Sequence, residues 1–215
     1  MALGALERQG GIRAAFRIEW LTIGWMSVEL VVGVVTALAS GSPALMAFGL
    51  DSAIEILSAV VLLWRIRIEA NGAADDRVEE VERRSSGIVG ALLLLLAVYV
   101  VMSSGLALRG GARPGESLAG MVLAAAALVV MPLLIRRKRA IATRIGSAAL
   151  RADAACGTVC AYMALVLLAG LLLRGAFGWW WADPIAALGI VWFIVREARE
   201  GIETYLGRED TCSNA

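Results

Sequence analysis

Six long apolar stretches constrain this chain more than any other feature of its sequence. They are Ile18–Ser40, Pro43–Trp64, Gly87–Leu108, Leu118–Ile135, Ala154–Leu173 and Phe177–Val195. Each is close to the ~20 apolar residues that an α-helix needs to cross the hydrocarbon of a bilayer. Because 60% of the 215 residues are apolar, against about half in soluble domains, we expect lipid to be the solvent. The sequence therefore predicts an all-α integral membrane protein, a bundle of six transmembrane helices.

Turn-forming residues separate these stretches. The segment Ser40-Gly41-Ser42-Pro43 predicts a tight turn after the first, and the glycine-rich segment Arg109–Glu116 separates the third from the fourth. Asp183 followed by Pro184 predicts the N-cap and the first helical position of the sixth helix. The preceding tryptophans, Trp179–Trp181, are typical of a membrane–water interface.

Basic residues are distributed unevenly between the connecting segments. If the N-terminus is cytoplasmic, all lysines and arginines except Arg109, Arg113 and Arg174 lie on the cytoplasmic side. This asymmetry predicts cytoplasmic locations for both termini. The expected division is a cytoplasmic segment at 1–17 that is no signal peptide, a transmembrane domain at 18–195 and a short cytoplasmic tail at 196–215. We expect no sizeable soluble domain, and the alanine- and arginine-rich composition is typical of a bacterial inner (plasma) membrane.

Charge and composition exclude several classes of function. The formal net charge of +1 indicates no nucleic-acid partner, and three cysteines are too few for a disulfide scaffold. The chain has no histidine, which is the commonest metal ligand and the usual proton carrier near neutral pH. Any metal binding or proton transfer must therefore use carboxylates or thiols.

Three acidic residues, Glu29, Asp51 and Glu55, lie well inside the apolar stretches. A charge in the middle of a membrane costs roughly 2.5–3.5 kcal/mol even on lenient insertion scales. These side chains must therefore face a polar interior, pair with a cation or hold a proton. Asp51 and Glu55 are four residues apart, so they share one face of their helix.

The fifth stretch carries a second pair with the same spacing, Cys156 and Cys160. A rise of ~1.5 Å per residue places Glu55 level with Cys156, and Asp51 level with Cys160. Two carboxylates and two thiols then form one cluster near the midplane. Such a tetrahedral set suits zinc, cadmium or iron(II), and suits magnesium or calcium badly. Metal binding would displace protons from the thiols, which is a basis for metal–proton antiport.

Three segments resemble the cation diffusion facilitator family of metal–proton antiporters. Residues 42–55, Ser-Pro-Ala-Leu-Met-Ala-Phe-Gly-Leu-Asp-Ser-Ala-Ile-Glu, are similar to that family's second helix. Residues 152–160, Ala-Asp-Ala-Ala-Cys-Gly-Thr-Val-Cys, are similar to its fifth helix, and 183–188, Asp-Pro-Ile-Ala-Ala-Leu, to the start of its sixth. The resemblance extends over about Ile18 to Glu203. It implies a transporter rather than an enzyme, with six helices and both termini cytoplasmic.

The family's ligand positions fall on the two pairs. Each family helix carries a His or Asp and, four residues later, an Asp; here those positions hold Asp51 and Glu55, then Cys156 and Cys160. The thiols favour zinc or a softer ion such as cadmium or iron(II). The chain also resembles a zinc efflux branch without a large cytoplasmic domain, so we expect the homodimer typical of the family to be held by membrane helices.

Three further acidic residues have open roles. Glu29 is an accessory candidate, as a fifth ligand, a proton carrier or a structural partner. Asp153 is a carboxylate at the cytoplasmic mouth or a helix cap, and we expect Glu19, beside Arg17, to be structural. Two other functions stay open for the chain: a thiol-based membrane redox protein using Cys156 with Cys160, and a non-transporting scaffold or assembly protein.

Overall fold

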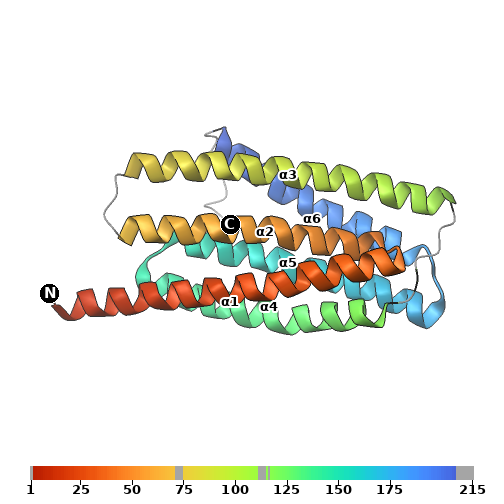
Figure 1. The fold of residues 1–215 in the computed structure, drawn as a ribbon, viewed down its shortest axis with the longest axis horizontal. Coiled ribbons are helices and arrows are strands. Elements are labelled where there is room, and N and C mark those ends of the chain that lie inside the picture. The colour runs from red at the N-terminus through yellow and green to blue at the C-terminus, as the bar shows by residue number, and fades with distance from the viewer. Residues whose placement is uncertain (1, 71–74, 111–114, 116, 207–215) are drawn as a thin grey trace.

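The protein is an all-α bundle of long, roughly antiparallel helices (Figure 1). The structure is a computed structural model that describes residues 2–70, 75–110, 115 and 117–206. Its helices are α1 (Ala2–Ser40), α2 (Pro43–Ala70), α3 (Asp75–Gly110), α4 (Leu118–Ile145), α5 (Ala148–Phe177) and α6 (Ala182–Tyr205). The prediction of an all-α membrane bundle without strands is confirmed for the described residues.

Local capping explains where several helices begin and end. Gly41 adopts a left-handed φ of 68° between α1 and α2, and Ser42 Oγ accepts a hydrogen bond of 3.1 Å from the Leu45 amide at the start of α2. Ser117 and Ser147 cap α4 and α5 in the same way, by accepting from the amides three residues later. The predicted turn at residues 40–43 is therefore confirmed.

The helices form three closely packed pairs, α1 with α2, α4 with α5, and α3 with α6. Helix α2 is central, since it also contacts α3, α5 and α6. Helix α1 begins at one end of the bundle, the helices then alternate in direction, and α6 ends toward that same end (Figure 1). We call this the terminal end, and the opposite end, where α2, α4 and α6 begin, the far end.

Helices α1 and α2 touch backbone to backbone beside the middle of the bundle. A Cβ atom added at Gly49 would lie 2.9 Å from the Val34 amide nitrogen, and one at Gly33 would lie 3.0 Å from the Gly49 Cα. Both distances are too short for a side chain to fit. Small residues at this crossing therefore permit a close approach that is typical of membrane helix pairs.

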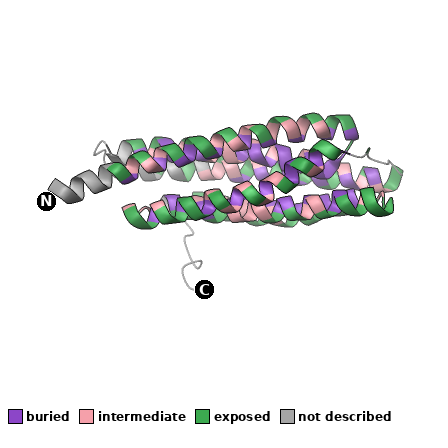
Figure 2. Cartoon of the chain, turned by 90° about the horizontal axis from the view of Figure 1, so that it is seen from below, coloured by how far each residue is buried: buried purple, intermediate pink, exposed green. Residues whose placement is uncertain are grey.

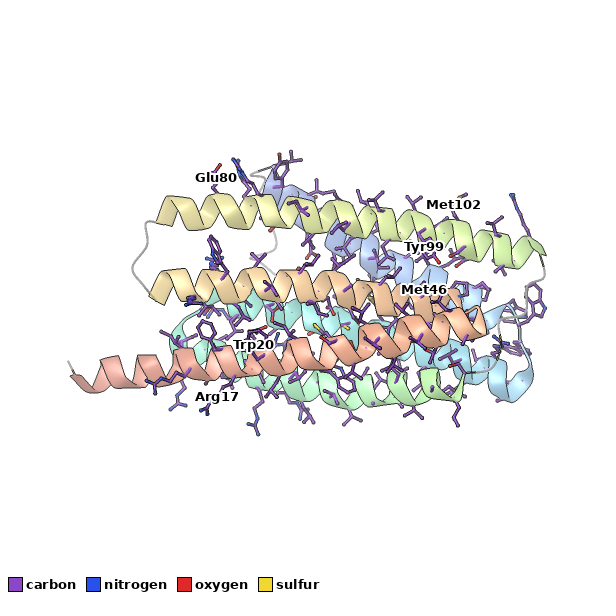
Figure 3. All side chains as sticks on the ribbon, viewed as in Figure 1. Arg17, Trp20, Met46, Glu80, Tyr99 and Met102 are labelled. Carbon is purple, nitrogen blue, oxygen red and sulfur yellow. The ribbon has the colours of Figure 1, made fainter. Side chains whose placement is uncertain are left out.

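The outer surface of the bundle is strongly apolar. Large apolar side chains such as Leu38, Leu118 and Met102 are exposed, while polar side chains such as Glu29 and Asp51 are buried. Figure 2 shows exposed residues along the outward faces of the helices, and Figure 3 shows the side chains that cover them. This distribution suits a bundle surrounded by lipid.

Among the described residues, five helices contain segments long and apolar enough to cross a membrane. These are Gly10–Ser40, Pro43–Arg67, Ser86–Gly110, Leu118–Ile145 and Asp153–Phe177. Helix α6 is less apolar because charged residues follow Val195, including Arg196, Glu197 and Arg199. Beyond the predicted spans, α2 continues to Ala70 and α3 begins at Asp75, both at the terminal end.

The predicted start of the sixth span is wrong. Phe177 is the last residue of α5, and α6 begins at Ala182 after Trp181, which has no side-chain capping bond. Asp183 lies within the first turn instead of capping it, because its carboxylate is used across the bundle. Its Oδ1 accepts a hydrogen bond of 2.6 Å from Ser42 Oγ. A tertiary contact has therefore replaced the local capping role.

Candidate metal centre

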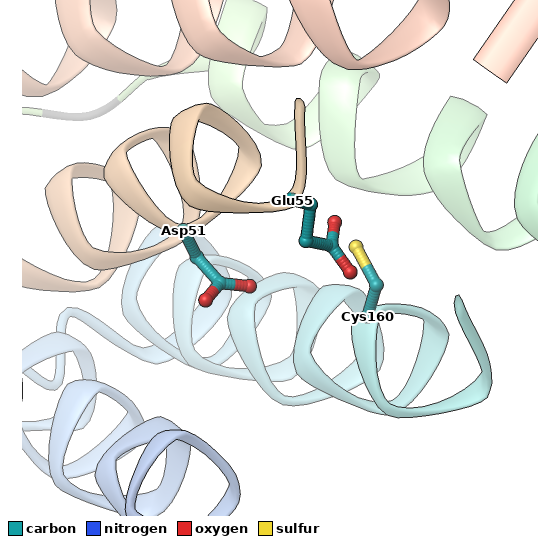
Figure 4. A group of neighbouring side chains, drawn as sticks. All are labelled: Asp51, Glu55 and Cys160. Atoms are coloured by element: carbon teal, nitrogen blue, oxygen red, sulfur yellow. The ribbon is translucent and has the colours of Figure 1, made fainter. Parts of the chain in front are cut away.

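Three predicted ligands meet in the middle of the bundle. One ligand atom each of Asp51, Glu55 and Cys160 lies within 4.8 Å of the other two. Figure 4 shows the two carboxylates of α2 and the thiol of α5 converging on one space. Because Asp51 and Glu55 are one helical turn apart, α2 presents both to the same neighbour.

The carboxylates of this group have unsatisfied oxygens. Asp51 is only 1% exposed, and its Oδ1 and the Oε2 of Glu55 are buried without a hydrogen-bond partner among the described residues. Leaving such atoms unpaired is costly in a low-dielectric interior. A bound cation or a proton would satisfy them, so the donor set fits a metal with mixed oxygen and sulfur ligands.

Cys156 lies outside this group, so the structure brings together three of the four predicted ligands. It is exposed and lies one turn closer to the terminal end on α5. The predicted depth match paired Glu55 with Cys156, whereas Cys160 lies beside both carboxylates. Of the two predicted matches, the structure therefore brings Asp51 close to Cys160 but leaves Cys156 outside the group.

Glu29 is fully buried but separate from the three-ligand group. Its Oε1 accepts a hydrogen bond of 2.5 Å from Trp25 Nε1, and its Oε2 accepts one of 3.1 Å from Ser52 Oγ. Ser52 follows Asp51 on α2. With both oxygens occupied, Glu29 links α1 to α2 next to the candidate centre.

A cavity of ≈ 410 Å³ connects the candidate centre with the terminal end. Its lining on α2 runs from Asp51 to Arg65, whereas Leu45 and Phe48, toward the far end, are fully buried in the core. Five carboxyl groups and two basic groups line it: Asp51, Glu55, Asp153, Glu197 and Glu200, with Arg65 and Lys138. The excess of carboxylates favours cations over anions.

A buried ion triad borders the same cavity nearer the terminal end. Lys138 Nζ lies 3.1 Å from Glu19 and also pairs with Asp153. Asp153, expected as a mouth carboxylate or helix cap, is therefore an ion-pair partner, while Ser147 caps α5. Glu19, expected to be structural, is 0% exposed and takes part in this ion pair.

Sequence reasoning missed Lys138 and Glu197 as interior residues. Lys138 was counted with the cytoplasmic cations, yet it continues the buried stripe Ala127, Met131, Ile135 and Ala142 of α4. Its helical spacing was therefore a usable signal. Glu197, assigned to the tail, lines the cavity, and its Oε1 is buried without a partner among the described residues.

Comparison with known proteins gives the family. The cation efflux transmembrane domain matches residues 20–204. The magnetosome protein MamB of Paramagnetospirillum magneticum is 29% identical over 191 residues, 87% of this chain and 64% of MamB. MamB of Magnetospirillum gryphiswaldense is 27% identical over 80% of this chain and 59% of the relative.

An uncharacterized transporter of Synechocystis, sll1263, is 27% identical over 154 residues, which is 70% of this chain and 50% of that protein. The chain thus spans between half and two thirds of the length of these relatives. Since the domain match covers most of the residues, the protein belongs to the cation efflux family, the cation diffusion facilitators that its motifs resemble.

Proposed function

We propose that the protein exports a divalent transition-metal ion across the inner membrane of a bacterium in exchange for protons. The observation that carries the proposal is the group of Asp51, Glu55 and Cys160, with unpartnered buried oxygens at the inner end of a cavity. Membership of the cation efflux family supports metal transport as its use. In this scheme the metal is the substrate, not a resident cofactor.

The ligand chemistry favours zinc or a softer ion. A thiol beside two carboxylates provides the mixed donors that zinc accepts, and the sulfur raises the preference for cadmium or iron(II) over magnesium and calcium. Cys156 lines the same cavity one turn away. We assign it to the ion's route, as a further ligand that the metal meets before it reaches Cys160.

Proton exchange follows from the same donor set. A thiol binds metal as the thiolate, so metal and protons compete for it, and the two carboxylates add to this competition. The chain has no histidine to carry protons. We therefore expect metal affinity to fall as pH falls, and each metal ion released to be replaced by protons on the ligands themselves.

The direction of transport rests on the proposed orientation. The uneven distribution of basic residues supports a cytoplasmic location for the terminal end. In this proposal the cavity faces the cytoplasm and receives the ion there. Movement of helices that closes this end and opens the far end would release the ion outside. The family resemblance implies a homodimer, and we propose that membrane helices hold its two copies together.

Metal-driven proton flux in proteoliposomes tests the proposal. We expect Asp51→Ala and Cys160→Ala to reduce zinc- and cadmium-driven flux at least about tenfold, since loss of even an outer-shell partner of a metal typically costs 10–100-fold in affinity. Glu203→Ala is the matched control, because Glu203 is an acidic α6 residue outside the cavity that pairs with Arg199.

Unchanged flux in both Asp51→Ala and Cys160→Ala would reject the site. Two other outcomes would favour the alternative functions. Reversible oxidation of Cys156 and Cys160 without any metal effect would indicate a redox protein. Absence of metal binding by the purified wild type would indicate a scaffold or assembly protein.

A further inference from the structure

The triad of Glu19, Lys138 and Asp153 has the arrangement of a small cation site. Two carboxylates from different helices, α1 and α5, converge on one positive nitrogen supplied by α4. Lys138 is 4% exposed and Glu19 is 0% exposed, so solvent does not replace these contacts. The cation in this site is the side-chain ammonium group of Lys138.

The ammonium group of Lys138 occupies the space between the two carboxylates. Its Nζ donates a hydrogen bond of 3.1 Å to Glu19 Oε2, lies 3.1 Å from Glu19 Oε1 and also pairs with Asp153. Two carboxylates and one ammonium also leave a formal charge of −1. The oxygens would therefore accept a cation of higher charge if the ammonium were removed.

The triad also borders the cavity of the metal centre. Lys138 and Asp153 line that cavity together with Asp51 and Glu55. Asp153 is three residues from Cys156, which places the two near one another on α5. A divalent ion moving from the terminal end to the centre therefore passes Asp153 and Lys138.

We propose that Glu19 and Asp153 form a second divalent-cation site that Lys138 occupies with its own ammonium group. The inference rests on the proposed function for the route of the ion. The negative charge of the triad attracts cations into the cavity, and the tethered ammonium prevents them from being retained there. The protein then holds a single metal ion, at Asp51, Glu55 and Cys160.

The donor chemistry distinguishes the two sites. Glu19 and Asp153 supply only oxygen, which suits manganese or magnesium, whereas the centre includes the thiol of Cys160. Manganese is therefore the probe for the second site. If Lys138 alone held the two carboxylates together, they would move apart when its ammonium group is removed, and no manganese site would form.

Manganese binding to the purified protein in lipid nanodiscs, followed by electron paramagnetic resonance of the free ion, tests the proposal. We expect Lys138→Met to bind about one more Mn²⁺ per chain than the wild type. Lys138→Arg, which keeps the charge, should bind as the wild type does. Adding Asp153→Asn to Lys138→Met should remove the extra ion, whereas adding Asp51→Asn should not.

Lys138→Met with no more bound Mn²⁺ than the wild type would overturn the proposal. Folding is followed in parallel by thermal unfolding with and without Mn²⁺. A variant that folds only in Mn²⁺ would support a new site, and one that stays unfolded in Mn²⁺ would overturn it. Loss of zinc-driven flux in the wild type would reject the transport proposal, yet the extra manganese site would still be measurable.

Discussion

Two pairs of acidic residues lie in or beside one cavity and differ in how their charge is balanced. At the candidate centre, Asp51 and Glu55 lie beside a thiol and keep buried oxygens without partners among the described residues. Nearer the terminal end, Glu19 and Asp153 are paired with Lys138. An acid pair with a covalently attached cation is a fixed feature, whereas an acid pair without one can exchange its cation.

The largest expected effect comes from removing the cation that pairs with Glu19 and Asp153. Lys138→Met should lower the free energy of unfolding by about 3–5 kcal/mol in metal-free buffer, because it leaves the buried carboxylate of Glu19 and the half-buried carboxylate of Asp153 without their cation. Unfolding in mixed micelles by added denaturing detergent measures the change. The triple variant Glu19→Gln, Lys138→Met, Asp153→Asn should recover most of the loss, and equal instability in both variants would contradict the electrostatic explanation.

A smaller effect tests the role of the Cys160 thiol in the candidate centre. Cys160→Ser should weaken cadmium binding about tenfold or more relative to zinc, because an oxygen replaces the softest donor. Cys156→Ser is the matched control, with the same change one turn away on α5. Isothermal titration with both metals gives the ratio; a larger effect at Cys156 would make it the principal thiol ligand.

The smallest expected effect concerns the hydrogen bond between Ser52 and Glu29, next to the candidate centre. Ser52→Ala removes the hydrogen bond to Glu29 Oε2 and should lower stability by about 1–3 kcal/mol, because that oxygen becomes a buried unsatisfied acceptor. Zinc affinity should change less than in Cys160→Ser. The same unfolding and titration measurements check it, and a zinc effect as large as that of Cys160→Ser would place Glu29 among the ligands.

Hydropathy predicted the bundle because bilayer thickness imposes a length on each apolar stretch. It could not predict the tilt and rotation of each helix, which are set by packing against its neighbours and determine which residues face each other. The pairing of Cys160 with both Asp51 and Glu55 therefore required the structure. The acidic pair on α2 was recognisable from sequence, because carboxylates are rare in apolar stretches.

The triad of Glu19, Lys138 and Asp153 could not be predicted from the sequence for a different reason. Lys138 lies among Arg136, Arg137 and Arg139, so its charge suggested a cytoplasmic surface. Only the periodicity of α4 places it with the buried residues. Likewise, Asp183 resembled an N-cap because its partner, Ser42, is distant in sequence. Charge counts and local motifs contain no information about such distant partners.

The contact between Gly33 and Gly49 has a mechanical consequence. Side chains that separate two helices can change rotamer and absorb a small displacement, but backbones already in contact cannot. Helices α1 and α2 therefore move together as one rigid unit at this level. Asp51 lies two residues beyond Gly49, so a displacement of α1 toward α2 also displaces a carboxylate of the candidate centre.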